Sequence, residues 1–350
     1  MGYARRVNPC CAAAGLASRQ FFAGRWQQRH LDRGGLTMLS RVADRLYWLA
    51  RYLERSECTA RLLAAYSQLI LDAPTGLELG WDVLVRIIDA EPAFNKRYKL
   101  RSERNVIKFI MADEKNIGSI QNSILNAREN NRTSRAVLPG ELWEIINELQ
   151  LFVAGNVSQS IDRKARFAFL DDLTARHQQI NGLVASTLAR DDVFRFLKFG
   201  QLMERCDMTT RVIDVGTAAI RGMPKHRELA IPHLWSTVLK SLSALGAYQR
   251  EVGPLVESEE VINFVLCSDV FPRSLSFCML SVTEVLKPLR DSAAVTAPLQ
   301  ATSSELEKFD ASKIDMPGLH MFIDEIQAQL IATHNAAFEH WFTLQAEQLQ

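Results

Sequence analysis

The sequence predicts an all-α protein, a helical bundle of about a dozen helices with an internal pseudo-two-fold duplication. Three observations support this prediction. Only 17 glycines and 11 prolines occur in 350 residues, fewer turn-forming residues than an average domain contains. Apolar residues recur at helical spacing over long segments, and no alternating run of β-branched residues indicates a strand. Because hydrophobic residues make up 47% of the chain, we expect a large core.

The individual helices are predicted from this spacing and from signals at the helix ends. Turn-forming residues at 72–76 end the first helix, Pro139 suits the first position of a later one, and Gly222-Met223-Pro224 stops another. The segment Asp291–Ser304, rich in alanine, threonine and serine, is expected to be a loop. The predicted helices span Ser40–Leu71, Trp81–Ala90, Ser102–Met111, Asn116–Val137, Pro139–Val153, Arg166–Leu188, Asp191–Arg221, His233–Gly246, Glu257–Cys267, Pro272–Arg290 and Gly318–Gln348.

Residues 1–37 differ in composition from the rest of the chain. They contain six arginines, no lysine and one acid, Asp32. This composition fits a transit peptide, and a secretory signal fits less well. We favour a third interpretation, a disordered N-terminal extension or a mis-called start, because Met38 is a natural start and Ser40 is placed to cap the first helix. Residues 38–350 are then expected to form a single helical domain with halves at about 38–188 and 189–350.

Charge and cysteine usage narrow the function classes. The formal net charge is +1, so no overall field attracts nucleic acid or an anionic membrane. No apolar run approaches the ~20 residues that a membrane span needs. The cysteines after residue 37 form no Cys-x-x-Cys pair and lie on helical patterns, as reduced thiols do. We therefore expect a soluble, cytoplasmic protein without nucleic-acid or membrane partners.

Two segments of the chain repeat one another in both apolar and polar positions. When Leu46–Leu63 is set over Phe196–Ile213, at an offset of 150, the apolar stripes coincide. Chance helices share such stripes but seldom the charges beside them. The polar matches are Glu54 with Glu204, Arg55 with Arg205, Glu57 with Asp207, Thr59 with Thr209, and Arg61 with Arg211.

The repeated charges lie on or beside the apolar face of each helix. At about 100° per residue, Glu57 projects within the apolar arc, Glu54 and Arg61 border it, and Arg55 points elsewhere. A charge in such a place must be paired, and Glu57 with Arg61 stands in the favourable i, i+4 order. One interpretation is a pair of ionic clamps that only hold the fold. The other is a polar cavity where carboxylates and guanidinium groups meet an anionic or peptide-like ligand.

Sequence patterns of known catalytic sites are mostly missing, so we predict no cofactor and no metal. There is no P-loop, Gly-x-Gly-x-x-Gly or Gly-x-Ser-x-Gly pattern. There is also no His-Glu-x-x-His and no Glu-x-x-His, which argues against a di-metal centre in the bundle. Carboxylate pairs could perform acid–base chemistry, and whether the protein is an enzyme stays open.

Four motifs resemble those of a known family, and they occur in the family's order. They are Met38–Glu57, Met203-Glu204-Arg205-Cys206-Asp207, Ala127-Arg128-Glu129-Asn130 and Phe271-Pro272-Arg273-Ser274. The sequence in this respect resembles the alpha-E domain family, a bacterial all-helical group named for its Glu-Arg motif and of unknown function. The resemblance adds Arg128, Glu129, Asn130 and Arg273 to the candidate polar site, alongside the repeated charges.

The resemblance also implies a setting for the protein. Family members are typically encoded beside an ATP-grasp enzyme, which joins an activated carboxylate to an amine, and beside a transglutaminase-like protein. It implies an auxiliary or partner protein in the synthesis or modification of a small peptide, with a separate ATP-grasp ligase as partner. A helical enzyme or binding protein, and a structural duplication without a ligand site, are the alternatives.

Overall fold

The computed structural model describes residues 40–72, 80–221 and 230–343, and in these ranges the chain is all-α as predicted. Fourteen α-helices and no strand occur among the described residues. The predicted N-terminal extension, the turn at 73–76, the stop at 222–224 and the end of the last predicted helix lie outside them. No helix within the described ranges is both long and apolar enough to cross a bilayer.

Most helices begin and end within a few residues of the predicted positions. The first half contains α2 (Ser40–Asp72), α3 (Asp82–Ile87), α4 (Glu91–Asn95), α5 (Glu103–Met111), α6 (Ile120–Thr133), α7 (Gly140–Asn156) and α8 (Arg163–Thr187). The second contains α9 (Asp192–Arg221), α10 (Ile231–Ser241), α11 (Leu245–Glu251), α12 (Ser258–Cys267), α13 (Leu275–Leu286), α14 (Ser292–Leu306) and α15 (Met316–Ala337). Short helical turns lie between α7 and α8 at Gln159–Ile161, between α14 and α15 at Ala311–Lys313, and after α15 at Phe338–Phe342.

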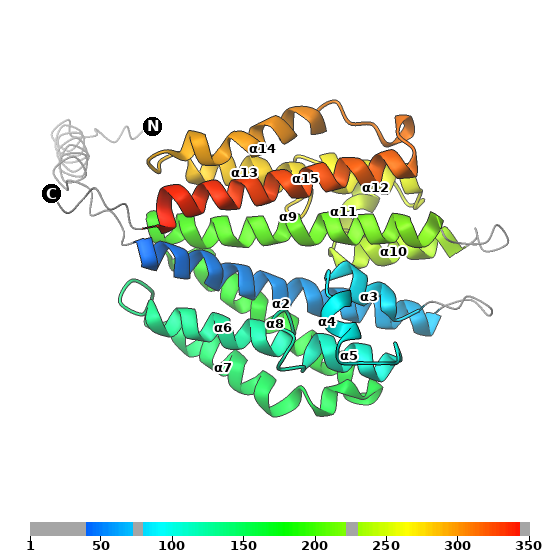
Figure 1. Ribbon diagram of the computed structural model, residues 1–350, viewed down its shortest axis with the longest axis horizontal. Coiled ribbons are helices and arrows are strands. Elements are labelled where there is room, and N and C mark those ends of the chain that lie inside the picture. The colour runs from blue at the N-terminus through cyan, green and yellow to red at the C-terminus, as the bar shows by residue number, and fades with distance from the viewer. Residues whose placement is uncertain (1–39, 73–79, 222–229, 344–350) are drawn as a thin grey trace, which may run out of the picture. The chain divides into compact units, whose positions relative to one another are not determined.

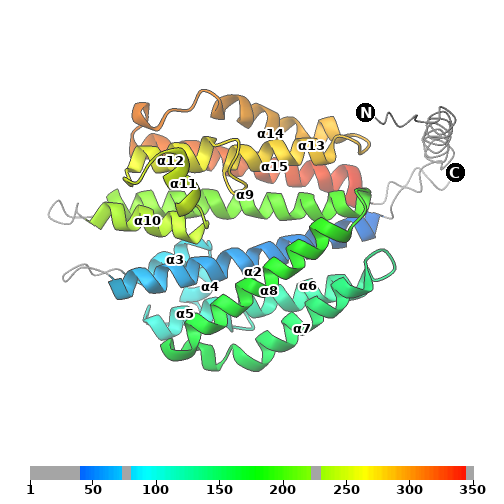
Figure 2. The ribbon, with the colours of Figure 1, turned by 180° about the vertical axis from the view of Figure 1, so that it is seen from behind.

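The long helices α2 and α9 lie side by side through the middle of the bundle (Figure 1). Helices α6 and α8 pack on α2, and α7 covers these two. On the other side α13 and α15 pack on α9, and α14 covers them, as the view from behind also shows (Figure 2). The apolar stripe that the sequence assigns to α2 is buried in this arrangement, with Leu46, Leu49 and Leu63 fully inaccessible. Burial of this stripe is what fixes the rotation of α2 about its axis.

Two predicted helices differ from the structure, one because it ends early and the other because it is divided into two. The segment predicted as one helix at 81–90 ends at Ile87, and the segment predicted at 233–246 is split between α10 and α11. A residue with left-handed backbone lies at each break, Asp89 with φ of 53° and Ser243 with φ of 54°. A non-glycine residue adopts this conformation singly and cannot continue a right-handed helix.

The prediction of a loop at Asp291–Ser304 was wrong, because α14 occupies almost all of this segment. Its alanines favour a helix, and Val295, Leu299 and Leu306 are buried at helical spacing. Pro298 lies inside the helix, where packing against α13 and α15 outweighs the backbone hydrogen bond that proline cannot donate. Tertiary contacts therefore override a composition that is typical of loops.

Candidate functional site

The two central helices make a close backbone contact where Gly200 of α9 lies against Tyr47 of α2. A Cβ atom added at Gly200 would lie 2.1 Å from the Tyr47 carbonyl oxygen. Only glycine allows this approach, since any other residue would force the helices apart. The contact brings the two Glu-Arg segments, which lie a little further along each helix, within reach of one another.

The glutamate of each Glu-Arg segment binds the arginine of the other. Arg205 donates to both oxygens of Glu54, with Nε–Oε1 and Nη2–Oε2 distances of 2.7 and 3.0 Å. Arg55 likewise donates to both oxygens of Glu204, with an Nη2–Oε2 distance of 3.0 Å. Both glutamates are fully buried, and a buried carboxylate requires such partners. Arg55 was predicted to point away from Glu54 on its own helix. This direction allows it to bind Glu204 on the facing helix.

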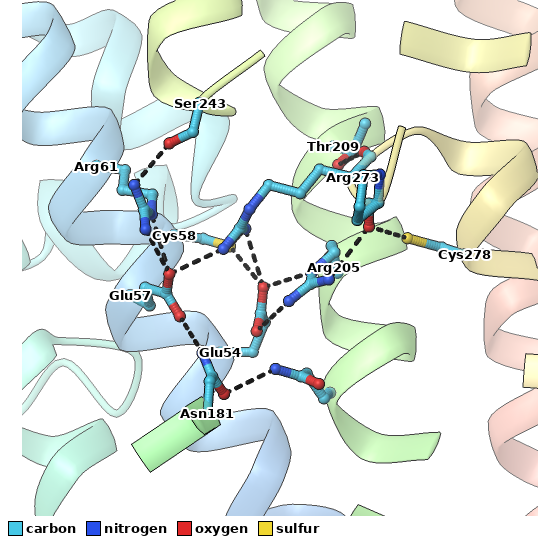
Figure 3. Close-up of polar contacts among 12 residues, drawn as sticks. Glu54, Glu57, Cys58, Arg61, Asn181, Arg205, Thr209, Ser243, Arg273 and Cys278 are labelled. Atoms are coloured by element: carbon cyan, nitrogen blue, oxygen red, sulfur yellow. Dashed lines mark hydrogen bonds and ion pairs between the residues drawn. The ribbon is translucent and has the colours of Figure 1, made fainter. Parts of the chain in front are cut away.

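Glu54 belongs to a network of five charged side chains, here called the first centre (Figure 3). Arg273, which precedes α13, lies between two carboxylates, 3.0 Å from Glu54 Oε1 and 2.8 Å from Glu57 Oε1. Arg61 donates to Glu57 Oε1 at 2.8 Å, which confirms the predicted i, i+4 pair, and Asn181 of α8 donates to Glu57 Oε2 at 3.0 Å. All four carboxylate oxygens are thereby engaged. The first centre consists of Glu54, Glu57, Arg61, Arg205 and Arg273.

A corresponding network around Glu204, here called the second centre, is less completely paired. Arg51 of α2 gives Glu204 its second arginine, with an Nε–Oε2 distance of 2.7 Å. Asp207 accepts from Arg211 at 2.9 Å, the other predicted i, i+4 pair, and no further donor reaches this carboxylate among the described residues. Arg211 also lies 3.4 Å from Asp89. The second centre consists of Arg51, Arg55, Glu204, Asp207 and Arg211.

The two centres differ in how they hold their charges. Burial opposes ionisation of Glu204, but Arg51 and Arg55 more than offset it and lower the pKa of this carboxyl to about 2. In the same way Arg205 and Arg273 overcome burial and hold the pKa of Glu54 well below its usual range. The pKa of Asp207 is instead raised, by burial and by the neighbouring Glu204 charge. Asp207 is therefore the acid of the two centres whose charge is least compensated.

The lowered pKa values of Glu54 and Glu204 predict that the protein loses stability in acid, whereas the raised pKa of Asp207 acts in the opposite direction. A carboxyl whose pKa is lowered by folding stabilises the fold fully above its unfolded pKa, and this contribution is lost as pH falls through the folded pKa. For Glu204 the window runs from 4.5 down to about 2, worth on the order of 3 kcal/mol. We expect urea titrations to show a free energy of unfolding that falls steadily through this window, and a shallower fall in Glu204→Gln. An unchanged pH slope in the variant would contradict the assignment.

A polar pocket of about 210 Å³ opens beside the second centre. Its helix-borne lining consists of Arg55, Thr59, Glu204, Asp207, Met208 and Arg211. The segments that connect α3 to α6 complete it with Ile88, Asp89, Asn116 and Gly118. The volume is several times the ~30 Å³ share of one water molecule, so the pocket is large enough for a small organic group.

A smaller and mainly apolar cavity, of about 40 Å³, lies beside the first centre. Lys198 and His177 contribute to its lining. Burial and the nearby Arg205 charge lower the pKa of Lys198 to about 8, and burial lowers the pKa of His177. Neither residue had a signal in the sequence, because a lone lysine or histidine on a helix is usually a surface or core residue.

The predicted candidates of α6 lie apart from both centres. Arg128 donates to Asn147 at 2.7 Å and stacks over the ring of Trp143. Glu129 pairs with Arg132 on the surface, where more than half of its side chain is exposed. No contact of the Asn130 side chain with either centre occurs in the described part of the chain. These three residues therefore do not join the network that the repeat and Arg273 build.

Two residues of the network were missing from the sequence-based candidates. Arg51 precedes Arg55 by four positions, so helical spacing alone placed both on one face and could have indicated it. Asn181 reaches Glu57 from α8, and its position in the sequence gave no such indication. Arg273, by contrast, entered the candidates only through the family resemblance, and its two carboxylate contacts place it within the first centre.

Comparison with known proteins gives one match. A family model, Alpha-E, described as a predicted alpha-helical domain with a conserved ER motif, matches residues 38–342. No curated protein and no solved structure matches the chain. Because the family model covers most of its length, the chain belongs to the Alpha-E family.

Proposed function

From this family membership and the geometry of the second centre, we propose that the chain is an auxiliary protein of peptide synthesis that binds a small peptide-like ligand in the polar pocket. The observation that supports this most strongly is the pocket itself, about 210 Å³ in volume and lined by Glu204 and Asp207. Ion pairs that only hold the fold need no such space, because neighbouring side chains could fill it without breaking the pairs.

The distribution of charges around the pocket supports a ligand that carries polar groups of both kinds. Arg55 and Arg211 offer donors for carbonyl or carboxylate oxygens, while Asp207 offers an acceptor for an amine or a guanidinium group. A peptide presents all of these groups within a few ångströms. The fully engaged first centre, in contrast, acts as the clamp that holds α2 on α9, because every oxygen of its two glutamates already has a donor.

Binding in the pocket predicts a ligand-dependent increase in melting temperature. We would screen amino acids and capped dipeptides of acidic, basic and neutral type by differential scanning fluorimetry. A ligand present at 100 times its dissociation constant stabilises the folded state by about 2.7 kcal/mol. We expect one class to raise the melting temperature of the wild type and to have little effect on Asp207→Asn.

The exposed Glu129→Gln substitution is the matched control, because it also removes one carboxylate charge but lies far from the pocket on α6. Its ligand response should equal that of the wild type. If no class of peptide or amino acid stabilises the wild type, or if Asp207→Asn responds like the wild type, the pocket is not the ligand site.

The partnership with an ATP-grasp ligase and a transglutaminase-like protein is the second part of the proposal, and it is supported by the family resemblance. In this arrangement the chain holds or presents the peptide while the ligase activates a carboxylate. We expect the tagged protein to copurify with the ligase from its native host. A clean failure to associate, under conditions in which both proteins are expressed, would count against this part and leave ligand binding to be judged separately.

A further inference from the structure

The pocket lies where the second centre, in the part of the chain that the structure describes, lacks a counterpart of Arg273. In the first centre, Arg273 contacts Glu54, Glu57 and Cys58, with an Nη1–Sγ distance of 3.5 Å to the last. At the sequence offset of 150, these three residues correspond to Glu204, Asp207 and Met208. All three line the pocket. The residues that would hold an arginine side chain are therefore present around an open space.

The backbone that carries Arg273 is also held by residues whose counterparts line the pocket. Arg205 donates to the carbonyl oxygen of Pro272 at 3.1 Å, and Thr209 donates to that of Arg273 at 3.3 Å. Their counterparts are Arg55 and Thr59, which both line the pocket. The pocket therefore contains counterparts of the residues that bind the two backbone carbonyls, as well as of those that bind the guanidinium group.

A glycine explains why the space is open. Arg273 directly precedes Ser274, the N-cap of α13, whose hydroxyl accepts from Phe277 N. Gly118 directly precedes Ser119, the N-cap of α6, whose hydroxyl accepts from Asn122 N. Helix α13 packs on α9 as α6 packs on α2, and Gly118 lines the pocket. A hydrogen atom thus stands where the other half has an arginine side chain.

The number of hydrogen-bond donors to each acid indicates which carboxylate would bind an added cation. Glu57 has three partners, Arg61, Arg273 and Asn181, whereas Arg211 is the one donor that reaches the Asp207 carboxylate within the described ranges. Arg51 already gives Glu204 its second guanidinium. A cation in the pocket would therefore pair chiefly with Asp207, where it would compensate a buried negative charge.

Charge balance allows this addition. The first centre has three arginines and two acids, a sum of +1. The second centre with Asp89 has three arginines and three acids, a sum of zero. The charged residues that line the pocket itself are two arginines and three acids, a sum of −1, so one guanidinium ion would neutralise the lining.

We propose that the pocket binds an arginine residue of a peptide, with its guanidinium group between Glu204 and Asp207 and its backbone carbonyls near Arg55 and Thr59. This inference rests on the proposed function, because it names the chemical class of the ligand for the same pocket. It differs from a general preference for peptides in requiring both a planar cation and a carbonyl.

The test is isothermal titration calorimetry with acetyl-prolyl-arginine amide and its neutral isostere, acetyl-prolyl-citrulline amide. Because a charge-assisted hydrogen bond contributes more than a neutral one, we expect the arginine peptide to bind the wild type about tenfold more tightly or better. In Asp207→Asn this ratio should fall to about one. Agmatine, which has the guanidinium group without a carbonyl, should bind more weakly than the peptide.

Gly118→Arg is the decisive variant, because it should fill the pocket from within. A Cβ at Gly118 meets only Asn116 Oδ1, at an ordinary 3.5 Å, so the chain has room to accept the substitution. We expect binding to be lost while the melting temperature stays the same or rises. Gly182→Arg is the control, since it adds the same side chain on α8 where a Cβ meets nothing within 4 Å, and it should bind like the wild type.

Equal binding of the arginine and citrulline peptides, or undiminished binding by Gly118→Arg, would overturn the inference. Agmatine that binds as tightly as the peptide would overturn the role of the carbonyls. If peptides without a guanidinium group bind and Gly118→Arg blocks them, the proposed function stands and the arginine assignment fails. If no peptide binds at all, both fail.

Discussion

Glu54→Gln is expected to destabilise the protein by about 3–5 kcal/mol, because it removes the charge that Arg205 and Arg273 share. Both guanidinium groups are almost completely buried, with side-chain exposures of 9% and 11%. A neutral amide accepts hydrogen bonds more weakly, so the buried Arg205 loses its carboxylate partner and Arg273 is left with Glu57 as its carboxylate. Urea unfolding followed by circular dichroism measures the effect.

The control for this substitution is Glu129→Gln, which removes the same charge from an exposed ion pair with Arg132. An exposed pair contributes little to stability, so its unfolding midpoint should stay close to that of the wild type. Equal midpoints for Glu54→Gln and Glu129→Gln would contradict the role of the first centre as a clamp between α2 and α9.

The second large effect is expected from Gly200→Ala, where the backbone of α9 lies close to that of α2. The added methyl group would lie 2.1 Å from the carbonyl oxygen and 2.9 Å from the carbonyl carbon of Tyr47. Neither atom can move without displacing α2. Overpacking of a core typically costs about 1–3 kcal/mol and occasionally more, and here it should exceed the ~1 kcal/mol that alanine gains over glycine in a helix.

Gly182→Ala separates the two contributions, because it makes the same change in α8, where a Cβ meets nothing within 4 Å. This variant should be stabilised by about 0.5–1 kcal/mol. The two substitutions are therefore expected to shift the unfolding midpoint in opposite directions. A stabilised Gly200→Ala would show that the helices do not approach as closely as described.

The sequence predicted the helices and the two charged segments because both depend on local spacing. The i, i+4 pairs Glu57–Arg61 and Asp207–Arg211 follow from the geometry of one helix, and both form. The exchange of arginines between Glu54 and Glu204 could not be predicted, since it depends on how two helices are rotated against one another. The helix α14 was missed for a similar reason, because packing against its neighbours stabilises a helix that contains Pro298 and several serines and threonines.

The least predictable feature is the pocket, because it arises from a side chain that is missing. Gly118 is one of 17 glycines, and nothing in its local sequence distinguishes it. It becomes informative only when its position before the N-cap Ser119 is compared with that of Arg273 before Ser274. The internal duplication itself stays a prediction from the sequence. The corresponding contacts around Glu54 and Glu204 are present in the structure whether or not the two halves arose by duplication.

Arginine binding in the pocket is tested most directly by a crystal structure of the protein with acetyl-prolyl-arginine amide at saturating concentration. We expect the guanidinium group within hydrogen-bond distance of Asp207, beside Glu204, with the peptide carbonyls near Arg55 and Thr59. Such a complex would reproduce the contacts that Arg273 makes in the first centre. A peptide bound elsewhere on the protein, or a pocket that stays without peptide under these conditions, would contradict arginine binding at the second centre.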